Sequence, residues 1–253
     1  MTEPLLPGAE PWSAAGGPAG ALCLHGFTGN PSSMRGLAEA FAAAGFSVEL
    51  PRLPGHGTTV EEMKGTRWAD WTAEVEAAYR RLAARTERVV VAGLSMGGSL
   101  SLWTALQHPE VAGLVLVNPA TMPQPAEVME MVHGMLDEGV DHMPGIGADI
   151  ADPDVTDSAY ESTPLVPLLS LMDGLAALQP ELAAITCPVL IITSANDHVV
   201  EPISSDHLAN AVSGPIERIA LERSFHVATL DYDGELVCRE AVAFAQKLTA
   251  AGR

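Results

Sequence analysis

VVVAGLSMGG, residues 89–98, places one serine between an apolar, β-branched run and a segment with helical periodicity. Its centre, GLSMG at residues 93–97, matches the G-x-S-x-G pattern, in which a sharp strand-to-helix turn exposes a serine hydroxyl. Side chains at positions 93 and 97 would collide with the neighbouring helix and strand, so glycine is needed at both. The stretch therefore predicts that Ser95 is a nucleophile rather than a small residue at a chance turn.

Apolar runs and helical patterns alternate on both sides of this stretch. Continuous apolar strands separated by helices are typical of a parallel sheet that is covered on both faces. We therefore expect an α/β fold built on a mostly parallel, doubly wound sheet. The expected strands are 21–26, 46–51, 88–94, 112–119, 188–194 and 217–222, and the expected helices are 31–45, 68–86, 96–109, 201–212 and 233–248.

Two segments fall outside this alternation. Residues 1–20 are rich in proline and glycine, which predicts an extended tail over the surface. About 65 residues lie between LVNPA (116–120) and CPVLIIT (187–193), far more than a usual connection of about 2–6 residues. We therefore expect a small cap at 121–186, inserted between the two parts of the core at 21–120 and 187–253.

A serine nucleophile needs a general base, and the base needs an acid that fixes its tautomer. Among eight histidines, His226 follows the last expected strand, where the base belongs in this type of fold. Asp197 follows the strand 188–194, and the order Ser95, Asp197, His226 matches the order of such a triad. Asp231 is a rival acid because it is close to His226 in sequence, although its place before a helix favours an N-cap.

The developing oxyanion needs two backbone donors. One is expected from Met96, which follows the nucleophile at the start of a helix. The other is expected from Phe27 in the loop HGFTGN, residues 25–30, where glycines let the chain bend.

Composition limits the partners. The net charge of −19 disfavours nucleic acid and anionic lipid surfaces and suits a neutral substrate. No apolar run is long enough for a membrane helix, and the N-terminus lacks a signal-peptide pattern. The three cysteines have no metal-ligand spacing and indicate a reducing compartment, so we expect a cytoplasmic protein without stable membrane insertion. The sequence leaves the oligomeric state open.

The motifs together resemble one superfamily. LHGFTGNPSSMRGLAEAFAAAGF (24–46), PRLPGHGTT (51–59), GLSMGG (93–98), DHVVEP (197–202) and SFHVATLD (224–231) are similar to the α/β-hydrolases. Together with MPGIGADI (143–150) and AYESTPLVP (159–167), they resemble the bacterial monoacylglycerol lipases and related small carboxylesterases. The likeness runs from about Leu22 to the C-terminus. The short N-terminus departs from the family, because it leaves little room for the antiparallel strands that open many members.

The resemblance implies ester hydrolysis through an acyl-serine, with no cofactor and no metal. It implies a cap over an apolar acyl channel, with Ile146 over the channel mouth and with Asp157, or else Glu161, near the glycerol hydroxyls. A monoacylglycerol is the expected substrate. A broad carboxylesterase or thioesterase with the same triad is the main alternative, and a non-catalytic ligand-binding homologue is a remote one.

Overall fold

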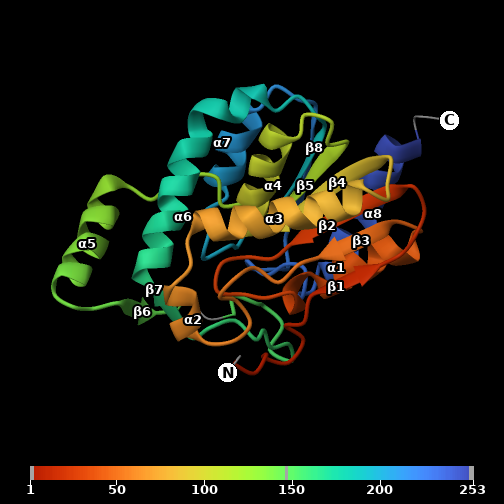
Figure 1. The fold of residues 1–253 in the computed structure, drawn as a ribbon. Coiled ribbons are helices and arrows are strands. Elements are labelled where there is room, and N and C mark those ends of the chain that lie inside the picture. The colour runs from red at the N-terminus through yellow and green to blue at the C-terminus, as the bar shows by residue number, and fades with distance from the viewer. Residues whose placement is uncertain (1–2, 146–147, 251–253) are drawn as a thin grey trace.

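The computed structural model describes residues 3–145 and 148–250 of the chain. Seven strands form one sheet in the order β1-β3-β2-β4-β5-β8-β9 (Figure 1). Neighbouring strands run parallel except β1, which pairs antiparallel with β3. The mostly parallel α/β sheet expected from the sequence is thus confirmed. Its strands are β1 (Trp12–Ala14), β2 (Ala19–Leu24), β3 (Ser47–Leu50), β4 (Arg88–Leu94), β5 (Gly113–Val117), β8 (Val189–Ser194) and β9 (Ile216–Leu221).

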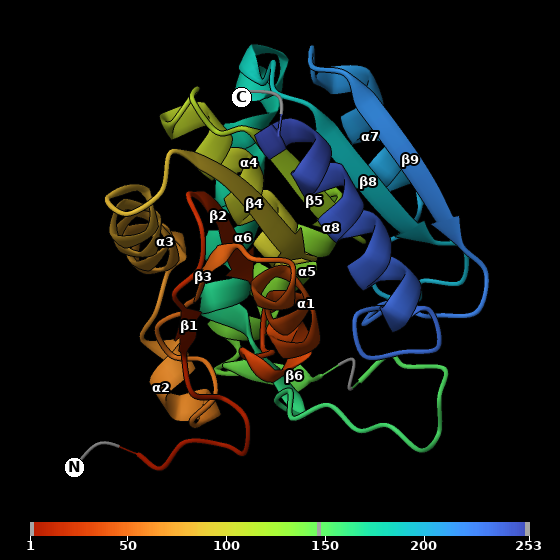
Figure 2. The same ribbon diagram turned by 90° about the vertical axis from the view of Figure 1, so that its right-hand side faces the viewer.

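Helices cover both faces of the sheet because its central strands are apolar on both sides. α1 (Ser32–Ala43) and α8 (Gly234–Ala250) pack on one face (Figure 2). Phe41 of α1 and Phe244 of α8 join the core there. The opposite face carries α3 (Trp68–Ala83), α4 (Met96–Gln107), α6 (Leu165–Leu178) and α7 (Ile203–Ala211), together with the short α2 (Val60–Lys64). Within the described ranges, no helix combines the length and the hydropathy that crossing a bilayer requires.

The N-terminal segment corrects one expectation. Residues 1–20 were expected as an extended tail, but Trp12–Ala14 form the edge strand β1 and Ala19 already begins β2. Strand β1 has three residues and pairs Ser13 with Glu49 of β3. So short a strand between glycine- and proline-rich stretches has no apolar run or periodicity that the sequence could reveal.

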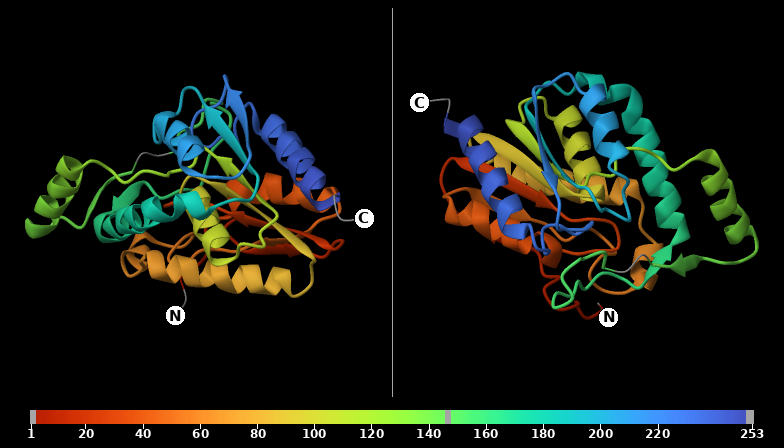
Figure 3. Two further views of the ribbon diagram at one scale, coloured as in Figure 1. Left: turned by 90° about the horizontal axis from the view of Figure 1, so that it is seen from above. Right: turned by 180° about the vertical axis from the view of Figure 1, so that it is seen from behind.

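The segment expected to form the cap is structured. It holds α5 (Ala126–Asp137), a two-stranded sheet of β6 (His142–Pro144) and β7 (Ser162–Pro164), then α6 and the 3-10 helix η1 (Gln179–Ala184). Helix α5 stands off from the rest of the molecule in both Figure 1 and Figure 3. Helix α6 instead packs on the sheet side, with Leu171 and Leu175 in the core. The exact bounds 121 and 186 of the cap stay a prediction.

The strand order fixes where a site can form. The chain passes from β2 to β3 on one side, then returns to add β4 on the other side of β2. Open α/β sheets bind ligands outside the carboxyl ends of the strands at such a reversal. The loop after β2 and the turn after β4 meet at this point.

Candidate active site

Ser95 occupies the turn between β4 and α4. Its backbone has φ 55° and ψ −118°, a left-handed conformation that a non-glycine residue adopts at a cost of about 1–3 kcal/mol. Strand β5 and the segment after it hold this turn, because the Ser95 N–H donates to Val117 O at 3.0 Å and the Ala120 N–H donates to Ser95 O at 3.2 Å. Strain maintained by surrounding hydrogen bonds is typical of functional positions.

The glycines around Ser95 allow three backbone segments to approach one another. A Cβ on Gly93 would overlap the carbonyl of Gly97, and a Cβ on Gly97 would overlap the carbonyl of Leu24 at the end of β2. A Cβ on Gly98 would lie 2.8 Å from the Cβ of Pro119. The steric reason for glycine at positions 93 and 97 is therefore visible in the packing.

The loop after β2 lies directly against the serine. A Cβ built on Gly26 would be 3.4 Å from the Cβ of Ser95 and 4.0 Å from its Oγ. Phe27 follows, and its ring packs edge-on against His56 and Trp71. Met96 is the first residue of α4, so its N–H has no carbonyl one turn earlier in the helix to bond. Both predicted oxyanion donors thus belong to segments that border Ser95.

Two buried histidines support this loop. His25 Nδ1 donates to the Gly26 carbonyl at 2.9 Å, and its Nε2 accepts the Leu53 N–H at 3.2 Å. Burial lowers the pKa of His25 to about 4. His56, whose ring is 5.1 Å from that of His25, has a pKa well below its usual range for the same reason. Both rings are therefore neutral near pH 7. His25 serves the loop as a hydrogen-bonding group, whereas His56 packs against Phe27 and bonds the carbonyl of Pro54.

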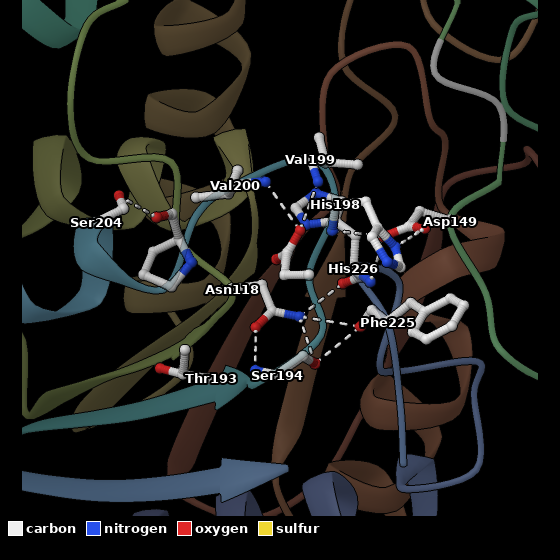
Figure 4. A network of polar contacts seen from close by, with 12 residues as sticks. Asn118, Asp149, Thr193, Ser194, His198, Val199, Val200, Ser204, Phe225 and His226 are labelled. Atoms are coloured by element: carbon white, nitrogen blue, oxygen red, sulfur yellow. Dashed lines mark hydrogen bonds and ion pairs between the residues drawn. The ribbon is translucent and has the colours of Figure 1, made fainter. Parts of the chain in front are cut away.

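The predicted base and acid lie together. His226, in the loop between β9 and α8, donates from Nδ1 to Oδ2 of Asp197 at 2.7 Å. The second oxygen of Asp197 accepts the N–H groups of Val199 and Val200, both at 2.8 Å (Figure 4). Both side chains are buried. The pairing fixes the tautomer in which His226 Nε2 is the acceptor.

Asp231, the rival acid, serves the main chain. Its carboxylate accepts the N–H groups of Phe225 at 2.8 Å, Ala151 at 2.7 Å and Asp152 at 3.1 Å. The expected N-cap role is wrong, because these donors lie in two loops outside α8. A buried carboxylate can be fully satisfied by loop N–H groups, and sequence position alone does not reveal which loops will supply them.

The sequence reasoning missed two residues that contact the His226 backbone. Asn118, at the end of β5 with φ 44°, donates its amide to the His226 carbonyl at 2.8 Å. It also bonds both the N–H and the hydroxyl of Ser194 (Figure 4). Asp149 accepts the His226 N–H at 3.0 Å. Asn118 could have been identified, because it is a polar residue directly after a buried strand. Asp149 could not, because it lies in an irregular segment without periodicity.

Three non-glycine residues in the described ranges have a positive φ: Thr28, Ser95 and Asn118. Each follows a strand of the sheet, namely β2, β4 and β5. The backbone strain of the described part of the molecule thus gathers at the carboxyl edge where the predicted triad lies.

The predicted cap residues have different settings. Asp157 has a buried Oδ1 with no hydrogen-bond partner among the described residues, and burial raises the pKa of its carboxyl group. Its segment packs on the loop after β2, because the Tyr160 N–H donates to Thr28 O at 3.0 Å and the Asn30 amide donates to Ser158 Oγ at 2.8 Å. Glu161 is exposed. The third residue, Ile146, lies outside the described residues.

Comparisons with known proteins show the family to which the chain belongs. The model of the family described as "Serine aminopeptidase, S33" matches residues 18–233. A thermostable monoacylglycerol lipase of Bacillus sp. (strain H-257) is 45% identical over 245 residues, covering 96% of this chain and 97% of the relative. A carboxylesterase of Bacillus subtilis (strain 168) is 28% identical over 242 residues, covering 94% and 97%.

Solved structures of lipolytic enzymes have the same fold as this chain. A structure from work on the metagenome-derived lipolytic enzymes LipS and LipT superimposes with a TM-score of 0.92 at 42% identity, covering 96% of this chain and all of that one. A monoacylglycerol lipase of Paleococcus ferrophilus shares the fold, with a TM-score of 0.79 at 19% identity over 94% of this chain and 99% of that one. The chain therefore belongs to the S33 family of serine α/β-hydrolases, alongside monoacylglycerol lipases and carboxylesterases.

Proposed function

We propose that this protein hydrolyses monoacylglycerols to a fatty acid and glycerol through an acyl-enzyme on Ser95. The observation that carries the reaction type is that three features lie at the carboxyl edge of one sheet: the strained Ser95, the loop of Gly26 against it, and the His226–Asp197 pair. The 45% identity to a monoacylglycerol lipase supports the substrate class.

The reaction follows from the roles of these groups. His226 Nε2 takes the Ser95 proton as Oγ attacks the ester carbonyl, and Asp197 stabilises the imidazolium that forms. The N–H groups of Phe27 and Met96 stabilise the oxyanion, each such donor being worth about 10²–10³ in rate. The tetrahedral intermediate collapses, and His226 returns the proton to the departing glycerol oxygen. Water then attacks the acyl-serine with His226 as base, which releases the fatty acid.

A glycerol subsite is the part of the proposal that separates a monoacylglycerol lipase from a general esterase. An apolar channel binds the acyl chain of a glycerol ester and a methyl ester equally, so selection needs polar groups that only the diol satisfies. Asp157 offers such a group: a buried carboxylate oxygen without a partner in the described structure, in a segment that packs on the oxyanion loop. A substrate hydroxyl that donates to Asp157 would remove the cost of leaving this oxygen unpaired.

The test compares kcat/KM for 1-lauroylglycerol and methyl laurate. Asp157→Ala should lower the value for the glycerol ester about 10–100-fold, as expected for a hydrogen bond to a charged group, and should leave methyl laurate unchanged. Asp154→Ala, at an exposed carboxylate of the same segment, is the matched control and should match wild type with both esters. Glu161→Ala tests the alternative: a selective loss on the glycerol ester in this variant instead would move the subsite from Asp157 to Glu161. Ser95→Ala supplies the blank.

Other outcomes select other functions. Equal wild-type rates on both esters, with comparable turnover of acyl-thioesters, would indicate the carboxylesterase or thioesterase alternative, which the similarity to a carboxylesterase over 94% of the chain favours. A wild type as inactive as Ser95→Ala would leave a ligand-binding homologue.

The setting of the enzyme belongs to the same proposal. A neutral lipid ester suits a surface of net charge −19, which repels anionic headgroups and nucleic acid. The three free thiols suit a reducing, cytoplasmic compartment, which cell fractionation would test.

A further inference from the structure

His226 lies in a loop and depends on other segments for its backbone geometry. Neither its N–H nor its carbonyl belongs to a helix or strand. The carbonyl accepts the Asn118 amide from the end of β5, and the N–H donates to Asp149. Because these two groups flank the Cα of His226, they fix the origin from which its imidazole projects toward Asp197.

Asp149 joins the loops that carry the predicted acid and base. Its Oδ2 accepts the N–H of His226 at 3.0 Å and the N–H of His198 at 3.1 Å. Its Oδ1 pairs with Nδ1 of His198 at 2.8 Å (Figure 4). Its carbonyl accepts the Val227 N–H at 3.0 Å. His198 directly follows Asp197. One carboxylate, 12% exposed, thus bridges the residue after the acid and the base itself.

A second carboxylate, in the loop of His226, binds main-chain N–H groups of the segment that carries Asp149. Asp231, from the loop of His226, accepts the N–H groups of Ala151 and Asp152, just beyond Asp149. It also accepts the Phe225 N–H, next to His226. The segment 149–152 and the loop 225–231 therefore hold one another through reciprocal carboxylate-to-backbone bonds, which constrain direction as well as distance.

We propose that Asp149, a residue of the segment expected to be the cap, is a positioning residue for His226. Its carboxylate holds the N–H of His226 and the loop after Asp197 in a fixed relative position, so that the imidazole stays aligned for proton transfer. The cap is then part of the catalytic machinery as well as a cover for the substrate. This inference rests on the proposed role of His226 as base.

The size of the effect follows from the geometry. Displacing a catalytic group by about 1 Å costs up to about 10²-fold in rate. Among the described residues, Asp149 makes no hydrogen bond or ion pair with Ser95 or with the two oxyanion donors, so its loss should act on kcat. KM for a short ester, which makes few contacts with the cap, should stay within about twofold, because uniform binding is unaffected.

The experiment measures kcat and KM for p-nitrophenyl butyrate, well below the melting temperature of each variant. Asp149→Ala should lower kcat about 10–100-fold. Asp149→Asn should recover most of the loss, because the amide oxygen still accepts both backbone N–H groups. Asp154→Ala, at an exposed carboxylate five residues along the same segment, is the matched control and should keep wild-type kcat.

A spectroscopic readout separates positioning from simple destabilisation. The proton between His226 Nδ1 and Asp197 should give a downfield ¹H NMR signal that is absent from His226→Ala. We expect Asp149→Ala to broaden or shift this signal, and Asp154→Ala to leave it in place. If Asp149→Ala does not fold, Asp149→Glu carries the same test, because it keeps the charge and moves the carboxylate by one methylene.

The remaining outcomes separate a failure of the proposed base, His226, from a failure of the proposed positioning residue, Asp149. An active His226→Ala would overturn the proposed role of the base. An inactive His226→Ala together with wild-type kcat in Asp149→Ala would overturn the positioning role alone. So would a rise in KM without a fall in kcat, because it would make Asp149 a substrate contact.

Discussion

Two buried aspartates lie close to His226, and only one of them meets its ring. Asp197 accepts a hydrogen bond from the imidazole of His226. Asp231 instead accepts main-chain N–H groups, both from the segment 149–152 and from the loop of His226. Replacing the carboxylate by an amide therefore has a different effect at each of the two positions. At Asp197 it changes the tautomer and charge of the base, and at Asp231 it changes the attachment of a loop.

The two Asp→Asn variants should consequently separate activity from stability. Asp197→Asn should lower kcat by about 10³–10⁴, because the amide favours the wrong tautomer of His226. Asp231→Asn should lower the melting temperature more than Asp197→Asn and lower kcat less, because an amide nitrogen cannot accept the N–H groups that the carboxylate now holds. Circular dichroism melts and p-nitrophenyl butyrate kinetics measure both. A larger kcat loss in Asp231→Asn would show that the acid is misassigned.

At the level of elements, the meeting of β2, β4 and α4 depends on missing side chains. Gly97→Ala places a Cβ into the carbonyl of Leu24, which is backbone and cannot rotate away. We expect this variant to lose several kcal/mol of stability or fail to fold, as strained backbone contacts in a packed core do. Urea unfolding gives the free energy.

Gly36→Ala in α1 is the matched control. Apart from the neighbouring residues and backbone of its own helix, no described atom lies within 4 Å of the added Cβ. Alanine should therefore stabilise this exposed helix position by about 0.5–1 kcal/mol. An equally tolerant Gly97→Ala would mean that α4 shifts without cost and that the close approach is not required.

The same elements show what the sequence could and could not predict. Strands β4, β5 and β8 were predicted within about a residue or two, because strands buried on both faces are continuous apolar runs. The edge strand β1 and the short strands β6 and β7 have no such runs. Ser95, Asp197 and His226 could be ordered by motif and strand position. Asp149 could not, because its role comes from a tertiary contact 77 residues away in sequence.

At the scale of the whole molecule, two neutral histidines make folding sensitive to acid. The pKa of His25 falls from 6.5 to about 4 on burial, and that of His56 falls well below 6.5. Below pH 6.5 the unfolded chain binds protons that the folded chain refuses, so stability is lost as the pH falls from about 6.5 toward 4. His25 alone accounts for about 3 kcal/mol over that range, at 1.36 kcal/mol per pKa unit.

His56→Asn tests this linkage. Asparagine removes one titrating group and can keep the hydrogen bond that Nδ1 makes to the Pro54 carbonyl. We expect a variant that is less stable at pH 7, because of the space left by the ring, but whose free energy of unfolding falls less between pH 6.5 and pH 5. His133→Asn, at an exposed histidine of α5, should keep the wild-type slope. Parallel slopes for His56→Asn and wild type would mean that His56 binds a proton in the folded protein as readily as in the unfolded chain. That result would contradict the buried, aromatic setting that His56 shares with Phe27 and Trp71.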